Sequence, residues 1–96
     1  MVADRRNQDA GVRALFANYH SGRHCIAATN GTAAIEAVMA ALNIGASDEV
    51  IVPDSTFVAT ASAVLFAGAM PVMVDVLPET DCIDPDLAEA AITPGA

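Results

Sequence analysis

The spacing of apolar residues along the chain switches between a helical and a strand-like period. Between Asp9 and His20 the apolar side chains recur at i, i+3, i+4 and i+7, which is typical of one helix face. They are Val12, Leu15, Phe16 and Tyr19. We expect Asp9 to cap this helix and Gly22 to end it. A second helix is predicted over residues 33–43, with apolar positions Ile35, Val38, Met39 and Leu42 and an end at Gly45.

Three short apolar runs predict buried strands at residues 25–29, 50–53 and 71–76. A third helix is expected between the last two runs, over about residues 57–69. Its candidate N-caps are Asp54, Ser55 and Thr56. A fourth helix is predicted to start at Asp84 and Pro85, a cap followed by a first-turn proline, and to continue to about Ile92.

The predicted elements alternate as α-β-α-β-α-β-α. This order indicates an α/β fold with three mainly parallel strands joined by helical crossovers. The third run is continuously apolar, which is typical of a strand that is covered on both faces.

The composition supports a folded chain that has few large side chains to fill its core. Hydrophobic residues make up 54% of the 96 residues and aromatic residues only 4%, so intrinsic disorder is excluded. The longest apolar stretch, residues 57–74, is broken by Gly68 and Pro71, which favours a helix followed by a strand over a membrane span. The polar start of the chain is not a signal peptide, and we expect a cytoplasmic protein. Cys25 and Cys82 are predicted to be reduced, buried thiols.

The charged residues exclude several kinds of chemistry. Twelve acids against four arginines give a net charge of −8, which does not suit a nucleic-acid binder. The chain contains no lysine, so it cannot form a Schiff base through a lysine side chain. His20 and His24 lack a third ligand nearby, and we predict no metal site.

Two junctions between a predicted strand and a predicted helix could bind a ligand. At the first, Gly31 and Thr32 offer free amides and a hydroxyl at a helix start, which suits either a phosphate site or an ordinary capped turn. At the second, the ring of Phe57 could stack on a flat cofactor or belong to the core. No Gly-x-Gly-x-x-Gly sequence follows a predicted strand, so a dinucleotide fingerprint is missing.

Six segments between about Leu15 and Pro94 resemble the nucleotide-sugar aminotransferases of the DegT/StrS group. They are Gly-Thr-Ala-Ala-Ile-Glu-Ala at 31–37, Asp-Glu-Val-Ile-Val-Pro at 48–53, Thr-Phe-Val-Ala-Thr at 56–60, Gly-Ala-Met-Pro-Val-Met-Val-Asp-Val at 68–76, and Ile-Asp-Pro at 83–85 with Ala-Ala-Ile-Thr-Pro at 90–94. The resemblance implies the large domain of a fold-type I enzyme that uses pyridoxal 5'-phosphate (PLP), with the aspartate aminotransferase fold. The order, spacing and residue types of the segments all agree.

The resemblance also implies roles for particular residues. Gly31, Thr32 and Ala33 would bind the phosphate of the cofactor through backbone amides and the Thr32 hydroxyl, and Phe57 would stack on its pyridine ring. The family's cofactor-bonding lysine and pyridine-pairing aspartate have no counterpart here, so no catalytic residue is assigned. Residues 1–96 are therefore expected to be a partial cofactor-binding large domain that is inactive alone.

The full-length protein implied by the resemblance is a homodimer that transfers an amino group, usually from glutamate, to a keto group on a nucleotide-linked sugar in polysaccharide biosynthesis. A sugar dehydratase of the same family is one alternative, and a non-catalytic α/β remnant or small anion-binding module is another. In the implied sheet, residues 25–29 lie at the edge far from the other two strands. The intervening strands are not in this chain, so residues 25–29 would have no native partner and their backbone N–H and C=O groups would be left unpaired. We therefore expect a chain that is molten, aggregation-prone or rearranged.

Overall fold

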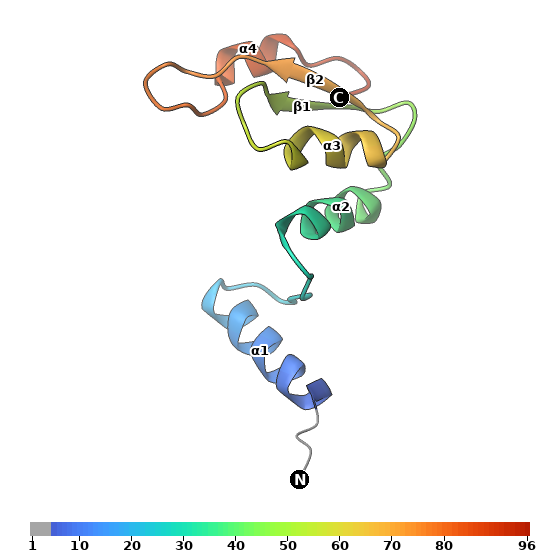
Figure 1. The fold of residues 1–96 in the computed structure, drawn as a ribbon, viewed down its shortest axis with the longest axis vertical. Coiled ribbons are helices and arrows are strands. Elements are labelled where there is room, and N and C mark those ends of the chain that lie inside the picture. The colour runs from blue at the N-terminus through green and yellow to red at the C-terminus, as the bar shows by residue number, and fades with distance from the viewer. Residues whose placement is uncertain (1–4) are drawn as a thin grey trace.

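A computed structural model describes residues 5–96 of the chain, with four helices and two strands in that range. The first two helices, α1 and α2, precede a unit in which α3 connects the two strands, and α4 follows (Figure 1). Their bounds are α1 Arg5–Tyr19, α2 Gly31–Ala41, β1 Glu49–Pro53, α3 Ala59–Phe66, β2 Met70–Val74 and α4 Pro85–Ala90.

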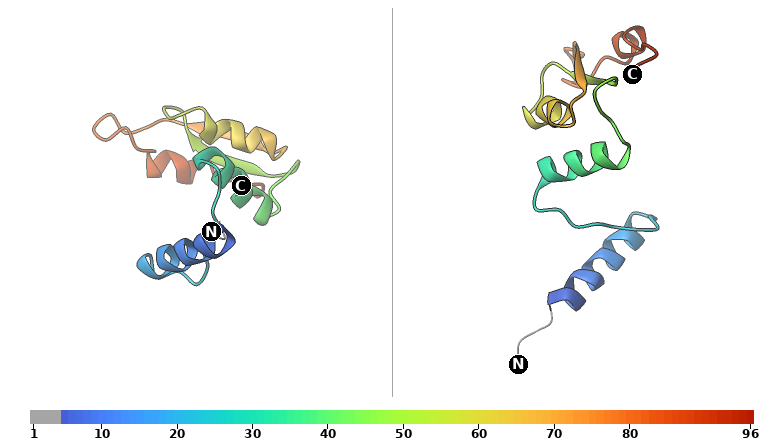
Figure 2. Two further views of the ribbon diagram at one scale, coloured as in Figure 1. Left: turned by 60° about the horizontal axis from the view of Figure 1, so that its bottom comes forward. Right: turned by 90° about the vertical axis from the view of Figure 1, so that its right-hand side faces the viewer.

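The two strands pair in parallel, as their apolar patterns predicted. Ile51 lies opposite Val72 in the register, and α3 is the crossover between the strands. The buried core forms where α3 meets the sheet and consists of Val52, Val64 and Ala69. Figure 2 shows α3 and α4 on opposite sides of the strands, with α2 packed outside α3. The structure therefore confirms an α/β layer built around a parallel strand pair.

Outside this layer the molecule is extended. Its Cα radius of gyration is 17.0 Å, whereas a compact chain of this length would have about 12.5 Å. The long axis measures 56 Å, and α1 stands at one end of it, separated from α3 by α2 (Figure 1). The apolar face predicted for the first helix exists, but it faces solvent: Leu15 is 73% exposed and Tyr19 84%.

The predicted strand at residues 25–29 is not formed. This segment runs between α1 and α2 without regular structure, and the side chain of Ile26 is 87% exposed. A strand needs a neighbour to pair its backbone amides and carbonyls, and β1 and β2 pair with each other elsewhere. The apolar residues at 25–29 were a sound reason to expect a strand. A strand also needs a neighbouring strand, and residues 25–29 have none in the described part of the chain.

Several predicted helix ends are also wrong. Asp9 lies inside α1 because residues 5–8 contain no helix breaker and the helix starts at Arg5. The positive-φ residues beyond α1 and α2 are Ser21 and Asn43, at 56° and 55°, and not the predicted Gly22 and Gly45. Polar side chains can tolerate this left-handed backbone, so a glycine is not required.

The start of α3 differs from the prediction, whereas the start of α4 agrees with it. α3 begins at Ala59 after Val58, whose side chain makes no capping bond, so none of the three proposed caps acts there. At α4, the Asp84 carboxylate accepts hydrogen bonds from the amides of Asp86 and Leu87, and Pro85 occupies the first turn. This confirms Asp84 as an N-cap.

Replacing this cap should loosen α4. We expect Asp84→Ala to weaken the helix by about 1 kcal/mol because two first-turn amides lose their acceptor. Asp84→Asn retains an acceptor oxygen and should have a much smaller effect. Hydrogen exchange at the Asp86 and Leu87 amides measures the difference, and equal exchange in both variants would contradict the capping role.

Candidate functional site

The start of α2 presents two amides that have no acceptor among the described residues. Asn30 is in extended conformation and its side-chain Oδ1 accepts a hydrogen bond of 2.9 Å from the Ala33 amide. The Ala34 amide donates to the Asn30 carbonyl, at 3.1 Å. Within residues 5–96 the structure gives the amides of Gly31 and Thr32 no acceptor. These two donors lie at the positive end of the helix dipole, where an anion is stabilised.

There is open space beside these donors. A β-carbon built on Gly31 would meet no atom within 4 Å. Thr32 is partly exposed, so its hydroxyl is accessible from the same helix end. The first turn of α2 contains no acidic residue that would repel an anion. Two amides, one hydroxyl and free space fit a phosphate group.

Ala33 has a different place from the other two residues of the predicted phosphate site. Its amide is already bound by Asn30. Asn30 was not predicted to take part in the site, although asparagine before a helical run is a common N-cap. The available donors are therefore those of Gly31 and Thr32, while Ala33 helps to fix the turn that presents them.

Phe57 lies in the loop between β1 and α3. Its side chain is 74% exposed, so it is not a core residue in this structure. It precedes α3 by two residues and does not start the helix as predicted. The loop is tied to the sheet by the Asp54 amide, which donates to the Val74 carbonyl at 2.9 Å, and Thr56 Oγ1 lies 3.2 Å from Thr60 Oγ1.

The two junctions lie toward the same end of the strands. In Figure 1 the N-terminal ends of α2 and α3 are on the side to which the arrows of β1 and β2 point. Ligands of open α/β sheets bind at this carboxyl edge. The N-terminal ends of α2 and α3 thus face the same way, although α2 packs on α3 and no strand precedes α2 within residues 5–96.

The site is an open surface. Two hollows lie elsewhere, one of 280 Å³ between α2 and α3 and one of 260 Å³ beside α2, and neither is lined by Gly31, Thr32, Ala33 or Phe57. Gly31 and Phe57 are exposed, and Thr32 and Ala33 are partly exposed, so the predicted phosphate and ring contacts would be made near the surface.

Other predicted chemistry can be compared with the same residues. Cys25 is half-buried and Cys82 is exposed, so the expectation of two buried thiols is wrong, although both are free thiols. Residues 5–96 hold no group of three or more His, Cys, Asp or Glu side chains placed to bind a metal ion. Every helix in this range falls short of the length and apolarity that a bilayer span requires.

Comparison with known proteins identifies the family. Residues 10–96 match the DegT/DnrJ/EryC1/StrS aminotransferase family. The chain belongs to this family. The resemblance inferred from the six sequence segments is thereby confirmed, and the relatives are aminotransferases.

Curated relatives of this family member act on sugars and related cyclic compounds. The L-glutamine:2-deoxy-scyllo-inosose aminotransferase of Streptomyces kanamyceticus is 51% identical over 79 residues, which cover 82% of the chain and 18% of the relative. The UDP-2-acetamido-2-deoxy-3-oxo-D-glucuronate aminotransferase of Pseudomonas aeruginosa is 50% identical over 79 residues, covering 82% and 22%. The chain spans about a fifth of the length of these relatives.

Solved structures of aminotransferases confirm the fold. DesV from S. venezuelae, in complex with a ketimine intermediate, matches with a TM-score of 0.88 and 36% identity over 99% of the chain and 25% of DesV. NtdA from Bacillus subtilis, with bound cofactor PMP, matches with a TM-score of 0.85 and 43% identity over 90% of the chain and 20% of NtdA. PLP or its amine form PMP is thus implied as the cofactor of this family.

Proposed function

We propose that residues 1–96 form part of the cofactor-binding large domain of a PLP-dependent aminotransferase. The reaction is transfer of an amino group from an amino acid to the keto group of a sugar or a related cyclic polyol. Relatives named for a UDP-linked keto-sugar and for inosose support this acceptor class. Relatives named for L-glutamine support glutamine as a donor alongside the glutamate that the family resemblance implied.

The pair of unpartnered amides at Gly31 and Thr32 is the observation that carries this proposal. They would hold the phosphate of the cofactor, with the Thr32 hydroxyl as a third donor. Asn30 would keep the turn in place by binding the Ala33 amide. Phe57 would cover the pyridine ring from the neighbouring junction. When bound, PLP supplies the electron-withdrawing ring that amino-group transfer requires.

We further propose that the intact protein works as a homodimer. The chain exposes large apolar side chains on α1 and α2, among them Leu15, Tyr19 and Leu42. Exposed apolar surface of this extent is typical of faces that are covered in an assembly.

The phosphate site can be tested with PMP, which has no aldehyde that reacts with amines. Titration of the labelled chain should shift the amide signals of Gly31 and Thr32 in NMR spectra. We expect Thr32→Val to weaken binding by about tenfold because a hydrogen bond to a charged group is lost. Thr80→Val, in a loop distant in sequence, is the matched control. Pyridoxamine without the phosphate should shift neither amide, and an equal shift with both ligands would contradict a phosphate site.

Phe57 should contribute to binding of the ring but not of the phosphate. We expect Phe57→Ala to weaken PMP about fivefold and to leave inorganic phosphate unchanged, because only the stacking contact is removed. Phe66→Ala removes another exposed ring, 77% exposed at the end of α3, and serves as the control. Equal affinities for PMP and phosphate in the unmodified chain would instead favour the small anion-binding module.

A further inference from the structure

The loop between β1 and α3 leaves the ring of Phe57 with little packing. The side chain is 74% exposed, so few neighbouring atoms restrict its direction. Val58, which precedes the first residue of α3, has helical backbone angles, and no side-chain hydrogen bond caps the helix there. The position from which the ring projects therefore depends on the hydrogen bonds of the residues that flank Phe57.

Thr60, in the first turn of α3, bonds to the loop on both sides of Phe57. Its amide donates to the Phe57 carbonyl at 3.1 Å. Its Oγ1 lies 3.2 Å from the Oγ1 of Thr56, and either hydroxyl can donate to the other. Any residue except proline could make the first bond at position 60, whereas the second bond requires a hydroxyl. The side chain of Thr60 thus holds the residue that directly precedes Phe57.

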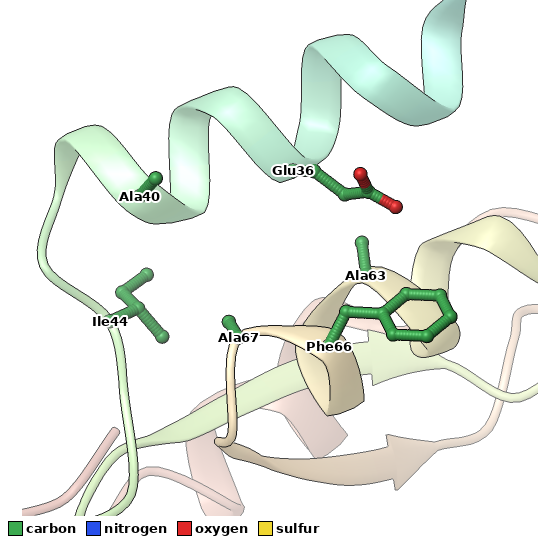
Figure 3. A pocket seen from close by; sticks show the side chains of 6 residues that line it. All are labelled: Glu36, Ala40, Ile44, Ala63, Phe66 and Ala67. Atoms are coloured by element: carbon green, nitrogen blue, oxygen red, sulfur yellow. The ribbon is translucent and has the colours of Figure 1, made fainter.

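The hydroxyl of Thr60 is itself held in place by α3. Thr60 is half-buried, and its branched side chain is restricted to few χ1 rotamers within a helix. α3 is anchored by Val64, which is fully buried in the core at the sheet. On another side of the helix, Ala63 is directed toward α2 and lines the hollow of 280 Å³ between the two helices (Figure 3). Thr56 is exposed, so its bond to Thr60 connects an exposed loop to a fixed helix.

We propose that Thr60 is a positioning residue for Phe57: through Thr56 its hydroxyl restricts the loop backbone, so that the aromatic ring is already ordered when the cofactor binds. This role rests on the proposed function, in which Phe57 covers the pyridine ring. A side chain that is ordered in advance loses less conformational freedom when it binds a ligand, and the affinity is higher for that reason. Thr60 acts on the cofactor only through Phe57, so it should not affect the binding of phosphate alone.

The conformation of Phe57 can be measured by NMR in the free 96-residue chain. Thr60→Val removes the hydroxyl and keeps the branched shape, whereas Thr60→Ser keeps the hydroxyl. We expect Thr60→Val to give averaged χ1 couplings for Phe57 and faster hydrogen exchange of the residue-60 amide, because the loop loses one of its bonds to α3. Thr60→Ser should retain the values of the unmodified chain. Thr56→Val breaks the same bond from its other end and should reproduce the effect of Thr60→Val.

Two controls separate this effect from a general loss of structure. Ser62→Ala removes a hydroxyl from the same helix, and the structure gives the Ser62 side chain no hydrogen bond within residues 5–96. It should leave the couplings of Phe57 unchanged. Exchange of the Val52 amide, in the buried core, shows whether each variant is folded.

Binding of PMP then measures what the ordering of Phe57 contributes. We expect Thr60→Val to weaken PMP about threefold, less than the loss in Phe57→Ala, and to leave inorganic phosphate unchanged. In the Phe57→Ala background, Thr60→Val should have no further effect, since the two residues act as one unit.

Four results would overturn the proposal. They are an unchanged Phe57 conformation in Thr60→Val, equal changes in Ser62→Ala, failure of Thr60→Ser to retain the values of the unmodified chain, and a loss of PMP affinity that persists without Phe57. Absence of PMP binding by the unmodified chain would contradict the proposed function instead, and the spectra of the free chain would still decide whether Thr60 orders Phe57.

Discussion

No amino-group transfer is expected from the 96-residue chain, whichever amino acid, keto sugar and cofactor are supplied. The sequence contains no lysine, and a side-chain amine is needed to bond covalently to the PLP aldehyde. We expect transfer activity to be absent altogether, whereas Thr32→Val and Phe57→Ala should only weaken the binding of PMP. Borohydride reduction after incubation with PLP, followed by peptide mass analysis, should find no modified side chain.

The N-terminal amine is the control for this result. Any adduct should map to Met1 and should disappear when the terminus is acetylated, because the terminal amine is the one primary amine in the sequence. Amine product formed by the acetylated chain above the rate of free PLP would contradict the prediction. So would a reduced adduct at any internal residue.

We also expect the chain to unfold over a broad temperature range, with backbone amides that are unevenly protected from hydrogen exchange. In residues 5–96, the buried hydrophobic residues number seven, and four of them are alanines. Alanine contributes one methyl group, and burial of a methylene-sized group contributes only about 0.8 kcal/mol. We expect measurable amide protection in β1, β2 and α3, and almost none in α1 or at residues 22–29.

Two measurements check this uneven stability. Calorimetry should give a shallow heat-absorption curve, and hydrogen exchange should place the slow amides in the unit around Val64, which is fully buried. Slow exchange in α1 that persists on dilution would show that α1 is stable within its own chain. A sharp transition with uniform protection would contradict a layer held by so small a core.

Local patterns were sufficient for most elements of the fold. The helical spacing around Leu15, the cap at Asp84 and the parallel pair of apolar strands all depend on residues close in sequence, and the structure contains them. The failed strand at residues 25–29 depends on something else. Its apolar residues specify a segment that pairing could bury, but a neighbouring strand must provide that pairing. Ile26 is consequently exposed.

The candidate site was predictable in position but not in detail. The sequence located Gly31 and Thr32 at a helix start because they lie between an apolar run and a segment with helical spacing. It did not reveal that the Asn30 side chain occupies the Ala33 amide, since this depends on the conformation of the turn. The exposure of Phe57 depends on which elements cover the loop, and single-residue propensity carries no such information.

The crossover unit of β1, α3 and β2 has a consequence for the order of folding. Glu49 pairs with Met70, and Pro53 with Val74, so each paired residue is separated from its partner by 21 positions. Contacts this close in sequence close small loops, which form faster than contacts between distant segments. The unit can therefore nucleate folding soon after it is synthesised. Although α1 is synthesised first, its apolar face is still exposed after this unit has formed.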